Sequence, residues 1–292
     1  MELRLLRAFV HAARETTFSG AAITLSLTQP ALTKQIQQLE AIVGTSLFHR
    51  GRHGSELTAA GLALLDDARE IVDLAARFDA RAKRVAGGEE GRLTVGFGLS
   101  SITVAPRAVA AFRAKTPGVS VSLEDMSSSA QLELVRNGRL DIAFARLPIP
   151  VDLHSVPVLT DHLAIAHPTG WEAPRNDRLL AEWLDRHPLV RLSASRGPGL
   201  AAQTSRFIVA LGAQPAAIQD ADDLQTVLAL VAAGVGFAIV PESAGIVAPP
   251  RVEMVRLSGR GASWSVGVAW RPDNETPVVR GFLDELEPPG GR

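Results

Sequence analysis

The chain has 292 residues, of which 46% are hydrophobic and 21% are charged, enough for about two domains with apolar cores. Its 30 basic and 31 acidic side chains nearly cancel, so affinity for a polyanion would have to come from local patterning. Cysteine does not occur, which excludes disulfides, zinc–thiolate clusters and thiol redox sensing. Residues 1–60 carry six basic and four acidic side chains, a weak excess of positive charge.

Two features of the chain argue against export and membrane insertion. Residues 1–15 are amphipathic and charged throughout, unlike a signal peptide. The longest apolar run, residues 227–240, is shorter than the roughly 18 residues of a membrane span and contains Gly234 and Gly236. We read it as a buried helix, a turn and a strand. We expect a cytoplasmic protein that does not associate with membranes.

Residues 18–40 contain two short segments with helical apolar spacing, separated by a polar turn at residues 25–27. The apolar positions are Ala21, Ala22 and Leu25, followed by Leu32, Ile36 and Leu39. A first helix over residues 3–13 precedes them, with Thr17 or Ser19 as the N-cap of the second helix. Thr28 can cap the third helix, and Pro30 lies in its first turn, where the missing N–H costs nothing. This pattern predicts a helix-turn-helix.

The polar side of the third helix would face DNA if this prediction holds. Its candidate base contacts are Gln29, Pro30, Thr33 and Lys34. Its candidate phosphate or sugar contacts are Thr28, Gln35 and Gln38. For each of these side chains the alternative is an ordinary solvated helix face.

Residues 49–61, HRGRHGSELTAAG, suit a short hairpin or wing, in which Arg50 and Arg52 would hold the DNA backbone or enter a narrow minor groove. A solvated basic loop is the alternative. A long helix is expected over residues 58–85, with apolar positions stepping by four and three as in a coiled-coil seam. Those positions are Leu64, Ala68, Ile71, Ala75, Phe78, Ala82 and Val85. We interpret the seam as a homodimer contact, antiparallel in direction; the alternative is a face packed on its own domain.

Residues 87–91, GGEEG, form a polar hinge that marks a domain boundary. Beyond it, strands and helices alternate, which predicts βαβ units, a mostly parallel sheet, and two α/β lobes with a cleft between them. The expected strands are residues 92–97, 119–124, 141–145, 162–166, 236–240 and 265–270. The expected helices are residues 104–114, 130–137, 179–185, 200–211 and 224–233.

Several sequence stretches resemble the bacterial LysR-type transcriptional regulators over essentially the full chain. The stretches are AARETTFSGAAITLSLTQPALTKQIQQLEAIVGTSLFHR, then ELTAAG, then GRLTVGF, and finally LVAAGVGFAIVPES. Within that family, LEDMSSSAQ followed by DIAFARLP is most similar to regulators of aromatic-compound catabolism, which respond to muconate-like dicarboxylates.

The resemblance implies a multi-domain protein with three parts. These are an all-α winged helix-turn-helix at residues 1–58, a linker helix at 59–88, and an α/β effector domain at 89–292 with two Rossmann-like lobes, similar to periplasmic solute-binding proteins. Lobe I would comprise about residues 91–160 and 268–292, and lobe II about 161–267. The implied partners are double-stranded promoter DNA, a small organic anion as effector, RNA polymerase, and further copies of the chain in a dimer of dimers.

The chain itself supplies an anion-binding pattern between the two lobes. Polar side chains follow successive strands and precede helices, where backbone N–H groups and the helix dipole favour a carboxylate. The candidates are Ser100, Ser101, Ser127, Ser128, Arg146, Ser193, Arg196, Pro198, Gly199 and Leu200.

By resemblance, six of these candidates match positions that line the effector cleft of the aromatic-catabolism regulators. They are Ser100, Ser127, Arg146, Pro198, Gly199 and Leu200. Leu200 stands where those regulators carry an aromatic residue, and Arg196 adds a charge nearby, so the ligand need not be the same as theirs. The alternatives are helix capping for the serines and, for Arg146, a salt bridge to Asp141 or Asp161.

Two other functional classes fit the sequence less well. An enzyme is disfavoured because no Walker loop occurs, Gly96-Phe97-Gly98 lacks the third glycine of a dinucleotide fingerprint, and no Ser/His/Asp spacing stands out. His162 and His167 would lie on opposite faces of a strand, so we expect no metal and no cofactor. An extracytoplasmic solute-binding receptor would explain only the C-terminal part and would need an export signal.

Overall fold

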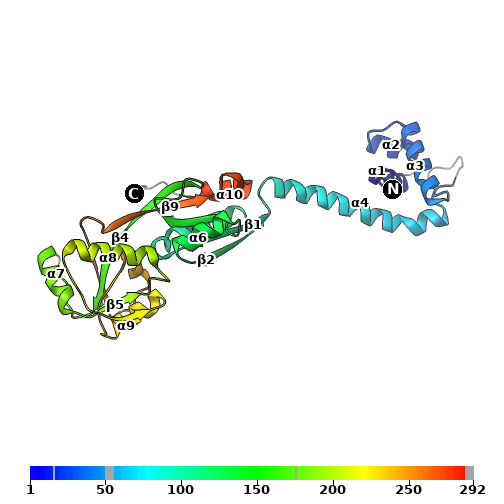
Figure 1. Ribbon diagram of the computed structural model, residues 1–292. Helices are drawn as coiled ribbons and strands as arrows, with labels where there is room; N and C mark the ends of the chain where they lie inside the picture. The colour runs from blue at the N-terminus through cyan, green and yellow to red at the C-terminus, as the bar shows by residue number, and fades with distance from the viewer. Residues whose placement is uncertain (16, 50–55, 175, 287–292) are drawn as a thin grey trace. The chain divides into compact units, whose positions relative to one another are not determined.

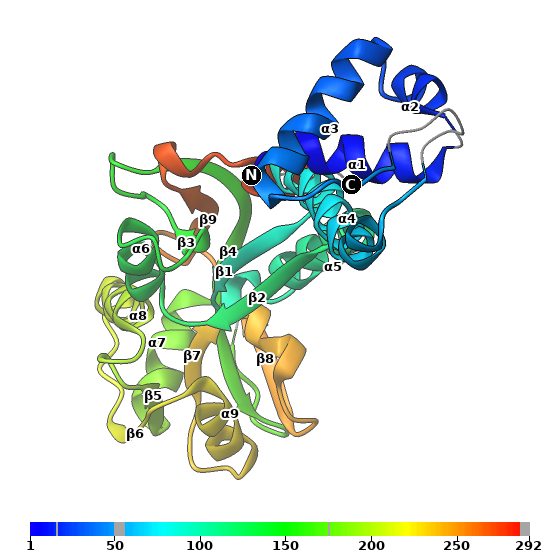
Figure 2. The ribbon, with the colours of Figure 1, turned by 90° about the vertical axis from the view of Figure 1, so that its right-hand side faces the viewer.

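The computed structural model describes residues 1–286 except 16, 50–55 and 175, and it divides into two compact units (Figures 1 and 2). The first unit is Met1–Arg84 and the second is Val85–Arg292. Each unit has its own hydrophobic core. Among the described residues, no helix is both long enough and apolar enough to cross a membrane.

The first unit begins with the three helices that the sequence predicts. They are α1 (Leu3–Arg14), α2 (Phe18–Thr24) and α3 (Gln29–Val43). The Thr17 hydroxyl caps α2 by accepting the Gly20 N–H at 3.1 Å, and the Thr28 hydroxyl caps α3 by accepting the Ala31 N–H at 3.4 Å. Gly44 ends α3 in the left-handed region, at φ 83°.

The core of this unit is organised around Phe48. Its ring meets the rings of Phe9 and Phe18 edge-on, with centroids 5.7 Å and 5.1 Å away. The Glu40 carboxylate accepts the backbone N–H groups of Leu47 at 2.7 Å and Phe48 at 3.3 Å, which ties the segment after α3 to that helix. Phe48 pairs with Leu57 in an antiparallel bridge, as at the base of a hairpin. The His49 N–H also donates to the Glu56 carbonyl at 2.8 Å, and residues 50–55 of the expected wing lie outside the described residues.

Helix α4 (Ala59–Ala86) is capped by Thr58, whose hydroxyl accepts the Gly61 N–H at 3.0 Å. The first part of the predicted seam packs on its own unit, since Ala68 is buried and Leu64 contacts the same core. For these two positions the alternative interpretation is therefore correct. Farther along, Ile71 and Phe78 keep 47% and 69% of their surface exposed.

The second unit contains a seven-stranded sheet in the order β2-β1-β3-β9-β4-β7, with β8 also paired to β4. Its strands are β1 (Gly91–Phe97), β2 (Val119–Asp125), β3 (Ile142–Arg146), β4 (His154–Pro168), β7 (Ala238–Pro241), β8 (Val252–Arg256) and β9 (Ser263–Trp270). A separate pair consists of β5 (Leu189–Leu192) and β6 (Ala217–Ala221).

Helices cover these strands on several sides. They are α5 (Val104–Lys115), α6 (Ser128–Arg136), α7 (Asp177–Arg186), α8 (Pro198–Leu211), α9 (Leu224–Ala232) and α10 (Pro277–Leu283), with short 3-10 turns η1 (Leu99–Ser101), η2 (Glu242–Val247) and η3 (Pro272–Asn274). Figure 1 shows α7, α8 and α9 around β5, while α6 lies beside β1 and β9. We call the part built on β1–β3 lobe I and the part built on β5–β8 lobe II.

The prediction of a mostly parallel sheet is wrong. Strand β1 runs parallel to β2 and β3, but β9 is antiparallel to both β3 and β4, and β4 is antiparallel to β7 and β8. The cause is the 15-residue strand β4, which pairs with β9 in its first half and with β7 and β8 in its second. The chain thus passes from lobe I to lobe II within one strand, of which the sequence pattern indicated only the second half.

The pattern also missed β5, β6, β8 and α10. Strand β5 has only four residues and follows Pro188, and β6 is exposed at all but its last position, so neither has a clear apolar period. Helix α10 does carry a local signal, because the Thr276 hydroxyl caps it and Pro277 stands at its first position.

Candidate nucleic-acid interface and anion site

Helix α3 has one buried face and one polar face. Leu32, Ile36 and Leu39 keep 0%, 3% and 1% of their surface exposed, because they pack into the core of the first unit. The candidate contact residues lie at other helical positions: Thr28, Gln29, Pro30, Lys34 and Gln38 are exposed, and Thr33 and Gln35 are partly exposed. The amphipathic spacing therefore leaves a continuous polar surface on this helix.

Hydrogen bonds orient two of the candidate base-contacting side chains. The Ser19 hydroxyl donates to Oε1 of Gln29 at 3.1 Å, which joins α2 to the first turn of α3. The Thr33 hydroxyl donates to the backbone carbonyl of Gln29 at 2.9 Å, so its methyl group is the part left to contact a ligand. Arg50 and Arg52 lie outside the described residues.

The carboxyl ends of β1, β2 and β3 meet at one edge of the lobe I sheet, because these strands are parallel. Candidate residues follow each strand: Ser100 and Ser101 after β1, Ser127 and Ser128 after β2, and Arg146 at the end of β3. The backbone N–H of Arg146 donates to the Ser128 hydroxyl at 3.1 Å, which joins the end of β3 to the N-terminus of α6.

The Arg146 side chain reaches residues of lobe II. Its Nη1 donates to Oε1 of Gln203 on α8 at 2.6 Å, and its Cζ lies 3.7 Å from the centre of the Trp264 ring. Gln203 is fixed in turn by donating its amide N–H groups to the carbonyls of Gly261 at 2.9 Å and Ser263 at 3.2 Å. Gly199 also lies close, since a methyl group there would be 3.7 Å from Cδ of Arg146.

The salt bridge considered for Arg146 is not formed with either aspartate. Asp141 instead accepts hydrogen bonds from Thr94 and Asn274, and Asp161 accepts one from the Ser243 hydroxyl at 2.8 Å. Burial lowers the pKa of Arg146 to about 10, although the negative charge of Asp161 acts in the opposite direction. Arg146 thus stays protonated at neutral pH, as a half-buried cation held by a neutral amide and an aromatic ring.

The candidate serines of lobe I differ in how their hydroxyls are engaged. Ser101 is 1% exposed, and its hydroxyl donates to the Gly98 carbonyl at 2.9 Å, so this residue caps η1 and is not placed to touch a ligand. Ser127 caps α6 by accepting the Ala130 N–H at 3.4 Å and also bonds the Ser129 hydroxyl at 3.0 Å. Ser100 is partly exposed in the same region.

Only part of the candidate segment of lobe II, residues 193–200, lies close to Arg146. Pro198 and Gly199 open α8 and are exposed, whereas Leu200 is 7% exposed and packs into the core, so its role as an effector contact stays a prediction. The Ser193 hydroxyl bonds that of Ser195 at 2.8 Å, and Arg196 is exposed. Sequence reasoning missed Gln203 and Trp264, because nothing local marks a glutamine in a helix or a tryptophan in a strand as partners of Arg146.

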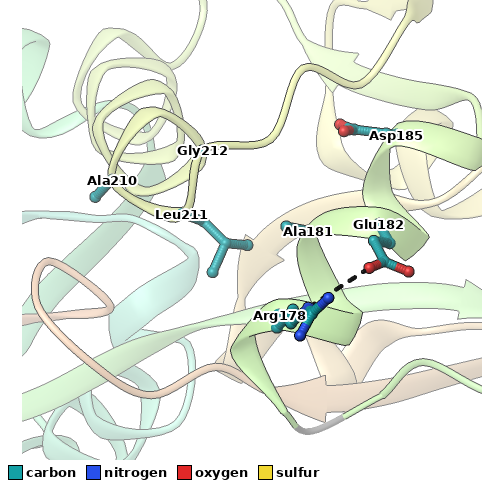
Figure 3. A pocket seen from close by; sticks show the side chains of 7 residues that line it. All are labelled: Arg178, Ala181, Glu182, Asp185, Ala210, Leu211 and Gly212. Atoms are coloured by element: carbon teal, nitrogen blue, oxygen red, sulfur yellow. Dashed lines mark ion pairs between the residues drawn. The ribbon is translucent and has the colours of Figure 1, made fainter.

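A separate groove lies between α7 and the end of α8 (Figure 3). Its volume is about 540 Å³, and Figure 3 shows Arg178 and Glu182 paired on its α7 side, with Leu211 and Gly212 opposite. It contains none of the candidate residues, so its size does not make it the anion site. Among the described residues, no group of three or more His, Cys, Asp or Glu side chains could hold a metal ion.

Two family models match the two units. The model of the bacterial regulatory helix-turn-helix protein of the lysR family matches residues 3–62, and that of the LysR substrate binding domain matches residues 86–288. Among curated proteins, the transcriptional regulator AlsR of Bacillus subtilis is 32% identical, over 97% of this chain and 94% of its own. The regulator TfdS of Cupriavidus pinatubonensis is 32% identical, over 97% of both chains.

Solved structures give the same result. The crystal structure of CbnR, a LysR family transcriptional regulator, is 30% identical over 98% of this chain and 100% of its own, with a TM-score of 0.78. Full-length CbnR complexed with its target DNA is 29% identical, covers 98% of both chains, and has a TM-score of 0.79.

The fold and these relatives define a DNA-binding transcriptional regulator with an effector-binding domain, and not an enzyme. The chain belongs to the LysR family. The family and the multi-domain fold class predicted from the sequence are therefore confirmed.

The contacts of Gln203 predict a local loss of stability when its side chain is removed. Gln203→Ala should lower the free energy of unfolding of the second unit by about 2–3 kcal/mol, because the carbonyls of Gly261 and Ser263 and the Arg146 guanidinium lose their partner. Tryptophan fluorescence during denaturation reports this unit, since its four tryptophans are Trp171, Trp183, Trp264 and Trp270. The control Gln225→Ala, at an exposed position of α9, should change it by less than about 0.5 kcal/mol. Equal effects of the two substitutions would contradict the bonding role of Gln203.

Proposed function

We propose that this protein binds promoter DNA through the polar face of α3, and that a small organic carboxylate held at Arg146 modulates the binding. The observation that carries the proposal is the half-buried Arg146 cation, which joins the two lobes without a carboxylate partner among the described residues. The effector would supply the missing negative charge.

The polar face of α3 supports the DNA half of the proposal. Gln29 can donate to base acceptors, the Thr33 methyl can touch a thymine methyl, and Lys34 can reach guanine acceptors. Thr28, Gln35 and Gln38 would contact phosphate or sugar and fix the register without reading sequence. The relative CbnR, whose solved complex contains its target DNA, supports the same use of this unit.

The surroundings of Arg146 support a carboxylate as effector. Two helix N-termini approach it, α6 through the Ser128 hydroxyl and α8 through Gly199. Helix N-termini present unpaired backbone N–H groups and a positive dipole end, and a guanidinium binds carboxylates with two parallel hydrogen bonds. Ser100 and Ser127 would add hydroxyl donors. The sequence resemblance to aromatic-catabolism regulators favours an aromatic catabolite or a muconate-like dicarboxylate within this class.

The exposed part of α4 supports assembly with further copies of the chain. Ile71 and Phe78 are followed at seam spacing by Val85, which is 49% exposed, and a row of exposed apolar side chains on one helix is a contact surface. We infer that two chains pair along this row and that two such dimers form the tetramer. Contact with RNA polymerase stays a prediction.

A base contact by Lys34 predicts that removing this side chain weakens DNA binding in a sequence-dependent way. Lys34→Ala should weaken binding to the promoter fragment upstream of the protein's own gene by about 1–3 kcal/mol, and binding to a scrambled duplex much less, because a base contact is lost. Fluorescence anisotropy at fixed salt measures both affinities. The control Lys115→Ala removes the same charge from the second unit and should change neither. An equal loss of affinity on both duplexes would mean that Lys34 contacts phosphate and not a base. No loss of affinity would contradict the proposal that Lys34 contacts DNA.

A carboxylate held at Arg146 predicts that effector affinity depends on the guanidinium of this residue. After a thermal-shift screen of small carboxylates, including muconate and benzoate, calorimetry should show that Arg146→Ala weakens the best ligand about 10- to 100-fold, as expected for loss of a charge-assisted hydrogen bond. Arg146→Lys should recover only part of the affinity, because lysine keeps the charge but not the planar fork. Arg136→Ala, an exposed arginine paired with Asp152, is the matched control. Unchanged affinity in Arg146→Ala would refute the assignment.

A further inference from the structure

A second arginine, Arg206, lies on the side of α8 that faces Arg146. Gly199, Gln203 and Arg206 are spaced by four and three residues, so they share one stripe of the helix. Two members of this stripe approach Arg146: Gln203 accepts its hydrogen bond at 2.6 Å, and a methyl group at Gly199 would lie 3.7 Å from its Cδ. Long helical side chains lean toward the N-terminal end of their helix, which for Arg206 is the end that carries Gln203 and Gly199.

The positive charges of the two arginines act on each other. Burial lowers the pKa of Arg146 to about 10, and the charge of Arg206 contributes in the same direction. Because such an effect falls off with distance and is screened by salt, the two guanidinium groups lie near one another, in agreement with the stripe on α8. An anion bound beside both groups would relieve their repulsion.

The Arg206 guanidinium is open to solvent and not neutralised. Arg206 is exposed, and its side chain forms no ion pair and no hydrogen bond with another residue in the described part of the chain. By contrast, the exposed Arg136 and Arg191 pair with Asp152 at 2.5 Å and Asp220 at 2.9 Å. A ligand can therefore reach Arg206 without displacing a protein carboxylate.

Arg196, which the sequence places beside the anion site, acts elsewhere. Asp223 caps α9 by accepting the Thr226 N–H at 2.7 Å. Hydrogen bonds from Thr226 lower the pKa of Asp223, and the charge of Arg196 has a smaller effect in the same direction. Arg196 thus acts on the start of α9, whereas Arg206 is the arginine whose charge acts on Arg146.

We propose that Arg206 determines how many negative charges the effector carries, by binding a second acidic group of a ligand whose first carboxylate is held at Arg146. The inference rests on the carboxylate site proposed above, and it narrows the effector to dianions. Arg146 and the N-termini of α6 and α8 would hold one carboxylate of a monoacid or a diacid alike. Arg206 adds a charge-assisted hydrogen bond for diacids alone.

Two pairs of acids test the proposal: terephthalate with 4-methylbenzoate, and trans,trans-muconate with sorbate. In each pair a methyl group replaces the second carboxylate, so shape is kept and one charge is lost. Calorimetry with the full-length protein should show that the diacid of at least one pair binds about 10- to 100-fold more tightly than its partner. Arg206→Gln should remove this preference by weakening the diacid alone. Arg206→Lys should keep part of it, because lysine retains the charge but not the planar fork.

Two further variants control the experiment. Arg178→Gln removes another exposed arginine of lobe II, on α7, and should leave every affinity unchanged. Arg146→Ala should weaken both members of a pair, whereas Arg206→Gln should weaken only the diacid, so the two arginines are tested separately. Thermal unfolding establishes that each variant is folded.

Three results would overturn the role of Arg206. They are the absence of a preference for either diacid in the unaltered protein, a preference that persists in Arg206→Gln, and an equal loss of monoacid and diacid affinity in Arg206→Gln. Unchanged affinities in Arg146→Ala would instead refute the carboxylate site on which the inference rests.

Discussion

Burial of Leu32, Ile36 and Leu39 sets the rotation of α3 and so decides which side chains of that helix remain in solvent. Each of these residues is at most 3% exposed, and burying a side chain of this size stabilises the fold by roughly 1.5–3 kcal/mol. Surface hydrogen bonds such as that from Ser19 to Gln29 contribute less, about 0.5–1.5 kcal/mol. Packing therefore fixes the helix, and the hydrogen bonds only orient side chains on a face that packing has already selected.

In the second unit, the positively charged guanidinium of Arg146 is held partly out of water. Gln203 and Trp264 stabilise the Arg146 guanidinium by a hydrogen bond and by ring contact, but neither cancels its charge. Arg146 belongs to β3 in lobe I, and both partners belong to elements that follow the crossing strand β4. A bound carboxylate would thus act where the lobes meet, at the contact between Arg146 and α8.

Local patterns predicted what local interactions determine. The helices of the first unit follow from apolar spacing, from the caps Thr17 and Thr28, and from the left-handed Gly44. The antiparallel direction of β9 could not be predicted from the sequence, because the direction of a strand depends on pairing with strands that are distant in the chain. For the same reason, Gln203 was not identified as the partner of Arg146, from which it is 57 residues away in the chain. Ser101 stood at a suitable position, but its hydroxyl orientation is set by a local turn that residue type alone does not specify.

We infer that α3 reads base identity and does not only contact the phosphate backbone. The most direct test measures the affinity of the unaltered protein and of Gln29→Ala for the promoter fragment and for a set of fragments in which each base pair is replaced in turn. If Gln29 reads a base, the unaltered protein should discriminate at one or more positions by about 1–3 kcal/mol, and Gln29→Ala should not discriminate there. Equal discrimination by both proteins at every position would contradict it.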